Sequence, residues 1–148
     1  MTAYDEVPYI GRPYAESHPG RLATMATLFG LKPAPVERCR LLEIACGDAS
    51  NLIPMAYALP GSEFVGFDLA ARPIEAGQRI AARLGLTNIS LARRDLADFS
   101  AGAGTFDYIV AHGIYSWVPP AVRDTVLAIC RAHLTAQGVA FVSYNTQP

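Results

Sequence analysis

Acidic side chains stand at the ends of three successive short apolar runs in this sequence. Glu43 lies within the first run, Asp68 directly follows the second, and Asp95 comes shortly after the third. Gly47 lies in the turn after the first run, where a residue without a side chain lets the backbone approach a ligand closely. In an open α/β sheet, ligands bind at the edge where the carboxyl ends of the strands meet. We therefore expect these four residues to face one site.

The chemistry of these residues fits a nucleoside that carries an amino-acid-like tail. A carboxylate inside an apolar strand, such as Glu43, needs a cationic or hydrogen-bonding partner to offset its desolvation, and a ligand ammonium can be that partner. Asp68 can accept hydrogen bonds from both hydroxyls of a ribose. Asp95 can accept a hydrogen bond from an adenine amino group while the neighbouring Leu96 packs against the ring.

Each acid taken alone also has an ordinary structural explanation. Glu43 can pair with a nearby arginine, Asp68 can cap a helix, and Asp95 can be a solvated acid of a loop, since acidic residues favour turns and caps. Their joint placement after three consecutive strands, with a glycine turn after the first, favours the binding site.

Short apolar runs alternate with amphipathic stretches from Arg40 onward, which is typical of a parallel sheet covered by helices. We therefore expect one α/β domain without internal repeats. An N-terminal arm broken by prolines precedes it and contains one short helix between Pro19 and Gly30. The expected strands are 41–45, 63–67, 88–92, 106–111 and 139–144, and the expected helices between them are 50–59, 73–84 and 121–134.

Several segments resemble the signatures of class I S-adenosylmethionine-dependent methyltransferases. These are residues 41–48, 64–68, 94–96 and 106–112, and the resemblance extends over about 41–144. A narrower group is also similar, namely bacterial methyltransferases that carry a C-terminal regulatory domain, some of whose relatives are protein-lysine methyltransferases. The segments that carry this narrower resemblance are 4–9, 112–120 and 142–146.

The resemblance implies a Rossmann-like class I methyltransferase fold that uses S-adenosylmethionine as its cofactor. It implies an arm over 1–39, a methyltransferase domain over 40–148, and methyl transfer to an unidentified acceptor, for which a protein lysine amine is one candidate. The residues that it places at the cofactor are Glu43, Ala45, Cys46, Gly47, Asn51, Asp68, Leu69, Asp95, Leu96 and His112, and those that it places in catalysis are His112 and Tyr115.

The sequence departs from the family pattern in two places. The usual turn G-x-G-x-G reads here as Ala45, Gly47 and Ala49, so that only the central glycine is kept. We expect the methyl group of Ala49 either to crowd the tail of the cofactor or to require a slightly different turn. The family's sheet also has two further strands that this sequence does not supply, since parallel strands need long crossovers. A C-terminally truncated domain, completed by a longer chain or by a partner chain, is the expectation.

The acceptor side of the site is expected just beyond the fourth strand. Methyl transfer from a sulfonium is an in-line displacement, so the main task of the protein is to hold the reacting groups in line. Tyr115 and Trp117 either form a wall around the acceptor or pack their loop, and His112 either polarises a substrate or donates to a backbone carbonyl. His18 lies in the arm, which in the resembled family folds over the cofactor, and it either takes part there or only begins a helix, whereas His133 is interpreted as a residue of a helix end. No metal site is expected, because the histidines and cysteines share no ligand spacing.

Charge and composition disfavour several other classes of protein. A net charge of −1 gives no field that would attract nucleic acid or an acidic membrane. The odd number of cysteines without a C-x-x-C pair indicates reduced thiols, and neither a signal peptide nor a membrane span is recognised, so we expect a cytoplasmic protein. The expected partners are the methyl acceptor, which is a protein or a small molecule, and either a regulatory domain in a longer chain or a second copy.

Two rival functions stay open at this point. A nicotinamide dinucleotide-binding protein shares the glycine turn and the acid after the second strand, but it requires G-x-G-x-x-G, and only Gly47 is available before Gly61. A non-catalytic or remnant module that binds S-adenosylmethionine would keep the nucleoside pocket without recognising an acceptor.

Overall fold

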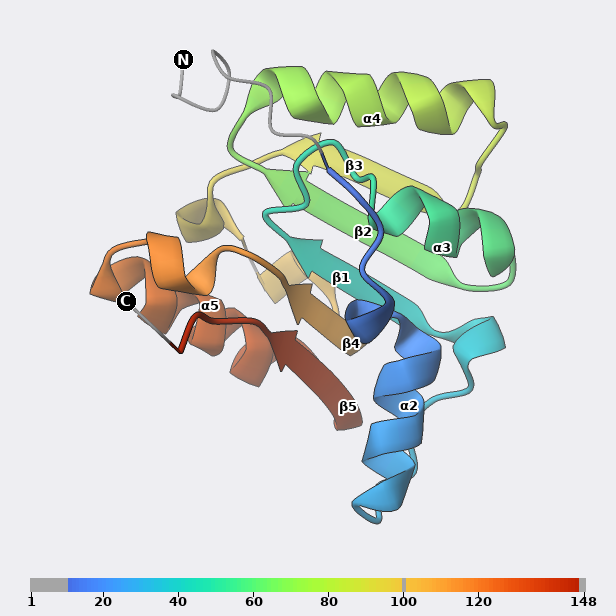
Figure 1. Cartoon of the computed structure of the whole chain (residues 1–148), viewed down its shortest axis with the longest axis vertical. Helices are drawn as coiled ribbons and strands as arrows, with labels where there is room; N and C mark the ends of the chain where they lie inside the picture. The colour runs from blue at the N-terminus through green and yellow to red at the C-terminus, as the bar shows by residue number, and fades with distance from the viewer. Residues whose placement is uncertain (1–10, 100, 147–148) are drawn as a thin grey trace.

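A five-stranded parallel sheet with strand order β3-β2-β1-β4-β5 forms the centre of the computed structural model, which describes residues 11–99 and 101–146 (Figure 1). All four pairings between neighbouring strands are parallel. The predicted α/β fold with a five-stranded parallel sheet is therefore confirmed. The strands are β1 (Arg40–Ile44), β2 (Glu63–Asp68), β3 (Ile89–Arg93), β4 (Phe106–Ala111) and β5 (Leu134–Val142).

Four α-helices lie where the apolar periodicity predicted helices, within about two residues at most ends. Proline at their starts agrees with this, since Pro19 and Pro120 open helices and Pro54 lies in a first turn, where a missing N–H costs no intrahelical bond. The helices are α2 (Pro19–Leu28), α3 (Leu52–Ala58), α4 (Ala71–Arg83) and α5 (Pro120–His133). The short 3₁₀ helices are η1 (Ala15–Ser17), η2 (Val36–Arg38), η3 (Leu96–Asp98), η4 (Ala101–Ala103) and η5 (Tyr115–Trp117).

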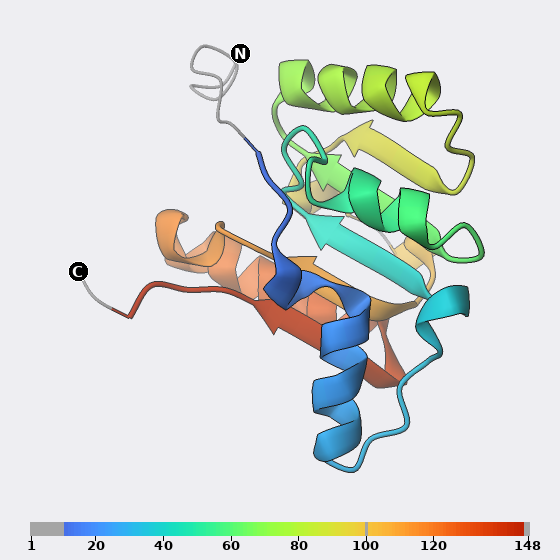
Figure 2. The ribbon, with the colours of Figure 1, turned by 45° about the vertical axis from the view of Figure 1, so that its right-hand side comes forward.

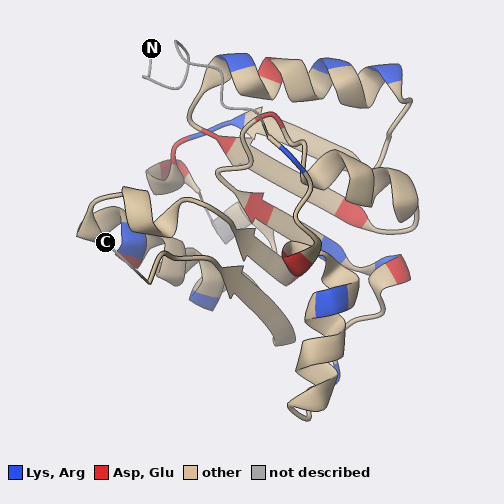
Figure 3. Ribbon diagram, viewed as in Figure 1, with Lys and Arg blue, Asp and Glu red and all other residues tan. Residues whose placement is uncertain are grey.

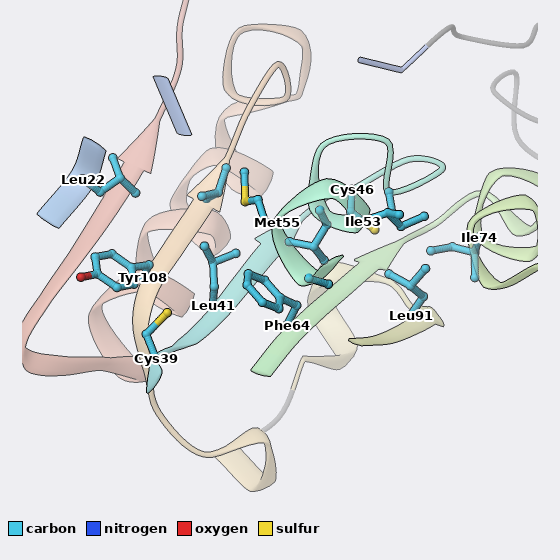
Figure 4. Packing of buried hydrophobic residues seen from close by; sticks show 14 residues of the cluster. Leu22, Cys39, Leu41, Cys46, Ile53, Met55, Phe64, Ile74, Leu91 and Tyr108 are labelled. Carbon is cyan, nitrogen blue, oxygen red and sulfur yellow. The ribbon is translucent and has the colours of Figure 1, made fainter. Parts of the chain in front are cut away.

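The helices cover the two faces of the sheet unequally (Figures 1 and 2). Alternate residues of each strand point to opposite faces, so Leu41 joins one core cluster and Leu42 the other. The cluster of Leu41, shown in Figure 4, takes side chains from α2, α3 and α4. The cluster of Leu42 takes its helical side chains from α5, with Leu96 and Phe99 packed against it. Both faces of the central strands are thus buried, as their continuous apolar runs require.

Strand β5 differs from its prediction, because it begins at Leu134, directly after α5, and ends at Val142. Leu134 pairs with Phe106, and the register then shifts, so that the next pair joins Tyr108 to Val139. Gly138 sits in this irregular stretch, where an added Cβ would lie 3.0 Å from the carbonyl oxygen of Asp107. The sequence around Gly138 resembled a loop between helix and strand, whereas it is a bulge that already pairs with β4.

Strand β5 lies at an edge of the sheet and carries no charged side chain (Figure 3). It pairs with β4 on one side, and no strand among residues 11–99 and 101–146 pairs with its other edge. Helix α2 packs near it, and the backbone N–H of Lys32 donates to Oε1 of Gln137 at 2.8 Å. At the end of α2, Leu28 is 75% exposed and Phe29 is 81% exposed. An edge strand without charged side chains leaves backbone groups open to pairing with another chain.

Candidate active site

The turn after β1 is fastened to the end of β2 by backbone and side-chain hydrogen bonds. The backbone N–H of Gly47 donates to Oδ2 of Asp68 at 2.9 Å, and that of Cys46 donates to the carbonyl of Phe67 at 3.1 Å. Oδ1 of Asp68 accepts from the backbone N–H of Ala70 at 2.9 Å. Asp68 therefore holds the turn after β1 and the residues that lead into α4, and each of its oxygens keeps a further lone pair for a ligand hydroxyl.

The turn keeps the backbone conformation that a glycine-rich sequence would supply. Ala45, Gly47 and Ala49 have φ angles of 56°, 57° and 58°, all in the left-handed region. This region costs a residue with a Cβ roughly 1–2 kcal/mol. The methyl group of Ala49 is fully buried in the core cluster on the α3 face of the sheet. Ala49 therefore adopts the left-handed conformation that a glycine would take there.

Glu43 is buried in β1 and is held by an amide. Its side chain is 4% exposed, and Oε1 accepts from Nδ2 of Asn51 at 2.7 Å, so its partner is Asn51 and not an arginine. Oε2 is buried and has no hydrogen-bond partner among the described residues. Burial raises the pKa of Glu43 to about 7; the Asn51 amide opposes this shift and the carboxylate of Asp48 adds to it. A buried carboxylate with one free oxygen suits a ligand that brings a cation.

Cys46 is placed in the turn but is unsuited to act as a nucleophile. It is 7% exposed, and burial, together with the carboxylates of Glu43 and Asp68, raises the pKa of its thiol well above the ordinary value. Reactivity requires the thiolate, which this surrounding disfavours.

The residues predicted for the adenine lie at the end of β3. Asp95 is exposed, and its Oδ1 accepts from the backbone N–H of Ala97 at 2.9 Å as the N-cap of η3. Leu96 is half-buried against the core cluster of α5, and Leu69 is 46% exposed. The backbone N–H of Arg94 donates to the carbonyl of Asp68 at 2.9 Å, which brings the ends of β2 and β3 together. The structure thus places Asp68, Leu69, Asp95 and Leu96 along one side of the edge.

His112 follows the end of β4 and is held between aromatic rings. Its ring centroid lies 3.8 Å from that of Tyr14 at an interplanar angle of 45° and 6.0 Å from that of Phe141 at 27°. Nδ1 of His112 is buried without a hydrogen-bond partner among the residues that the structure describes. Burial lowers the pKa of His112, an effect that Glu16 opposes and Arg12 reinforces. The imidazole is therefore neutral near pH 7.

The aromatic residues beyond β4 differ from one another in exposure. Tyr115 is half-buried, with the guanidinium of Arg123 5.7 Å from its ring centroid, whereas Trp117 is 71% exposed. The backbone N–H of Gly113 donates to Oγ of Ser143 at 2.8 Å, so this loop is tied to the segment after β5.

The other two histidines have structural contacts that account for them. Nδ1 of His18 accepts from the backbone N–H of Gly20 at 3.1 Å and caps α2. Nδ1 of His133 lies 2.7 Å from the carbonyl oxygen of Gly104, at the end of α5. Among the described residues, no group of three or more His, Cys, Asp or Glu side chains is arranged to hold a metal ion.

The family resemblance implies that the N-terminal arm folds over the cofactor, but sequence reasoning named none of the contacts that the arm makes at this site. Residues 11–17 run along the turn after β1 (Figure 2), and the backbone N–H of Tyr14 donates to Oδ1 of Asn51 at 2.9 Å. Ser17 is fully buried, and its Oγ accepts from Nδ2 of Asn51 at 3.0 Å. No local pattern pairs the arm with these residues, which come together only through folding. The segment 4–9 that contributed to the family resemblance lies outside the described residues.

Comparisons with known proteins agree with this geometry. A family model described as a methyltransferase domain matches residues 42–140. The uncharacterized protein RP789 of Rickettsia prowazekii is 43% identical over 145 residues, which make up 98% of this chain and 26% of that protein. The uncharacterized protein RP028 of the same organism is 40% identical over 146 residues, or 99% of this chain and 58% of that protein. The chain thus spans between about a quarter and somewhat more than half of these relatives.

A solved structure also resembles the chain along nearly its whole length. It is that of PKMT2 from Rickettsia typhi in complex with AdoHcy, which superposes with a TM-score of 0.91 at 38% sequence identity. The match covers 95% of this chain and 28% of that chain. Within the described part of the present structure, no helix is both long enough and apolar enough to cross a membrane.

Proposed function

The chain belongs to the family of methyltransferase domains, and from this premise we propose that it binds S-adenosylmethionine at the carboxyl edge of its sheet and transfers the methyl group to an acceptor. The predicted class I methyltransferase fold and the predicted cofactor agree with the family and with the AdoHcy complex of PKMT2. The observation that carries the proposal for this chain is the free, buried Oε2 of Glu43 at the end of β1.

Glu43 fits the ammonium group of an amino-acid tail. Near pH 7 its carboxyl group is close to its pKa of about 7, and a cation placed beside Oε2 would favour the ionised form. Asn51 already fixes the other oxygen, so the free oxygen is preorganised. The turn formed by Ala45, Cys46 and Gly47 follows Glu43 and Ile44 directly, and its backbone groups would contact the same amino-acid tail of the cofactor.

The remaining cofactor contacts that we propose follow the order of the strands. Asp68 would accept the ribose hydroxyls through lone pairs that Gly47 and Ala70 leave free. Leu69 and Leu96 would pack against the adenine, and Asp95 would accept from its amino group. Exposure of Asp95 supports this assignment, because its second oxygen is open to a ligand.

The acceptor would approach on the side of His112. Bound S-adenosylmethionine supplies an electrophilic methyl group on a sulfonium centre. The neutral imidazole of His112 can accept a proton or a hydrogen bond from the acceptor, since burial lowers its pKa. Tyr115 would line the same side. Their main contribution would be orientation, because an in-line displacement depends on the geometry of the reacting groups.

The acceptor that we propose is the side-chain amine of a protein lysine. The similarity to PKMT2, a protein lysine methyltransferase, supports it. A neutral His112 agrees with it, because an amine must lose its proton before it attacks a methyl group. The predicted cytoplasmic location stays a prediction, as does the regulatory domain or second copy.

Two ligands that differ in the amino-acid tail test the cofactor site. S-adenosylhomocysteine carries the tail, whereas 5′-methylthioadenosine keeps the adenine, the ribose and a thioether without it. In calorimetric titrations, Glu43→Gln should weaken S-adenosylhomocysteine about 10- to 100-fold and leave methylthioadenosine within about twofold. Asp68→Asn should weaken both ligands.

The matched control for this test is Asp124→Asn, which neutralises an exposed acid on α5 and should leave both affinities unchanged. NAD serves as the control ligand for the dinucleotide alternative. If S-adenosylhomocysteine does not bind to the folded chain, or if NAD binds more tightly, the proposed cofactor site is wrong.

Methyl transfer is tested separately with labelled S-adenosylmethionine and polylysine. Acid hydrolysis followed by amino-acid analysis should find labelled methyl-lysine, and chemically acetylated polylysine should take up no label. A chain that binds S-adenosylhomocysteine but labels neither polylysine nor a panel of small amines would support the non-catalytic binding module instead.

A further inference from the structure

The two buried side-chain atoms without a partner in the described structure lie on neighbouring strands. They are Oε2 of Glu43 and Nδ1 of His112. Strand β1 pairs with β4 so that Glu43 stands opposite Val110, two residues before His112. Residues two apart on a strand point to the same face, so both side chains open toward the face that α2 and α3 cover. The N-terminal arm passes along this face.

Tyr14, in the N-terminal arm, packs its ring against the imidazole of His112. The centroid distance of 3.8 Å is the shortest of the aromatic contacts in the described structure, and the ring of Phe141 lies 6.0 Å away. Most functional histidines are oriented by a hydrogen bond to one ring nitrogen. Nδ1 of His112 has no such bond among the described residues, so packing between Tyr14 and Phe141 must set the orientation of the ring.

The backbone of Tyr14 is linked to Glu43 through the side chain of Asn51. Its N–H donates to Oδ1 of Asn51 at 2.9 Å, and Nδ2 of the same Asn51 donates to Oε1 of Glu43 at 2.7 Å. Ser17 adds a second attachment, since its Oγ donates to the carbonyl of Tyr14 at 3.0 Å and accepts from Asn51 at 3.0 Å. Asn51 and Ser17 are both buried, so these bonds are protected from water.

From this geometry we infer that Tyr14 is a positioning residue of the methyl-transfer site, whose ring fixes the imidazole of His112 on the acceptor side while its backbone stays anchored to Asn51. The inference rests on the proposed function and extends it to Tyr14, which is not one of the predicted cofactor contacts but holds two of them, Asn51 and His112. Burial lowers the pKa of His112, an effect that Glu16 opposes and Arg12 reinforces, and the ring of Tyr14 lies 3.8 Å from the imidazole that is buried.

The test compares Tyr14→Ala with Tyr14→Phe by NMR titration of the three histidines of the folded chain. Tyr14→Ala should raise the pKa of His112, because it opens the ring to water. Tyr14→Phe keeps the ring and should titrate like the unmodified chain. His133, whose ring lies against Phe99 on the opposite face of the sheet, should be unaffected by either change.

Ligand binding separates this inference from the proposed function. Tyr14→Ala keeps the backbone N–H to Asn51, so S-adenosylhomocysteine should bind within about threefold of the unmodified affinity, a change well below 1.4 kcal/mol. The bound ligand should shift the His112 resonances in the unmodified chain and in Tyr14→Phe, and this response should be lost or altered in Tyr14→Ala.

The possible outcomes are distinct. An unchanged pKa of His112 in folded Tyr14→Ala would overturn the role of Tyr14, whether or not the ligand binds. Failure of S-adenosylhomocysteine to bind the unmodified chain would instead overturn the proposed function, while the effect of Tyr14 on His112 could still be measured. If the alanine variant does not fold, Tyr14→Val keeps part of the apolar packing but leaves His112 less covered, and a titration of His112 like that of the unmodified chain would equally overturn the inference.

Discussion

Asn51 donates a 2.7 Å hydrogen bond to Glu43, and among residues 11–99 and 101–146 this amide is the one hydrogen-bond partner of a carboxyl group that is only 4% exposed. One neutral donor does not offset the desolvation of a buried charge, which is why burial dominates and the pKa of Glu43 rises to about 7. The protein thus keeps a group that is costly to ionise in the unliganded state. A cationic ligand group would relieve that cost.

Replacing Glu43 with glutamine should make stability less dependent on pH. The folded state binds the Glu43 proton more tightly than the unfolded state, whose pKa is near 4.5, so stability declines as pH rises from about 4.5 through about 7. The decline from this group is at most about 3 kcal/mol. Glu43→Gln should match the unmodified chain below the unfolded pKa, near pH 4, and exceed it in unfolding free energy near pH 8, as measured by urea denaturation.

The control for this prediction is Asp124→Asn on the exposed side of α5, which should parallel the unmodified chain at every pH. A Glu43→Gln variant that is less stable than the unmodified chain at pH 8 would mean that Glu43 is ionised and well paired in the folded state.

Relief of backbone strain should distinguish the two alanines of the turn. Ala45 is partly exposed with φ of 56°, so Ala45→Gly should raise the unfolding free energy by about 0.5–1 kcal/mol, after allowance for the greater entropy of the unfolded chain. Ala49 has φ of 58°, but its methyl group is fully buried, so Ala49→Gly should gain about 0.8 kcal/mol less. Thermal and urea unfolding of both variants check this order, and a more stable Ala49→Gly would contradict it.

The sheet and the predicted strand-end acids could be found from sequence because both depend on local patterns. Leu41 and Phe106 begin apolar runs bounded by turns, and such runs predict buried strands wherever they occur. The start of β5 could not be found in this way, because Leu134 pairs with Phe106 through a bulge that depends on the backbone of Asp107. Pairing across an irregular register leaves no periodic signal.

The contacts that the N-terminal arm makes at the site could not be predicted from the sequence, for a different reason. Tyr14 and His112 stand far apart in the chain, and each alone has an unremarkable setting. Asn51 was expected at the cofactor from the family resemblance, but its two hydrogen bonds to the arm follow from the packing of residues 14–17 on the turn. Contacts of this kind require the tertiary fold, because no spacing rule relates a docked arm to a strand end.

Thiol reactivity offers a simple test of burial in the site. Burial raises the pKa of all three cysteine thiols, Cys39, Cys46 and Cys130, and each side chain is no more than 7% exposed. In the folded chain at pH 8, iodoacetamide should modify them about 100-fold more slowly than in urea. Mass spectrometry of tryptic peptides identifies each site, and rapid labelling of Cys46 alone would show that the turn opens.

Replacing Gly77 of α4 should weaken both the packing of α4 against the turn after β1 and the binding of the ligand. An added Cβ at Gly77 would lie 2.6 Å from the carbonyl oxygen of Asp48, so Gly77→Ala should push α4 away from the turn and destabilise the chain by about 1–3 kcal/mol. Because that turn is fastened to Asp68, S-adenosylhomocysteine should bind several-fold more weakly in calorimetric titrations. Gly85→Ala is the matched control, since it strains a residue with φ of +66° that has no neighbour within 4 Å of an added Cβ. It should lower stability without changing affinity, so equal affinities in both variants would refute the link between α4 and the site.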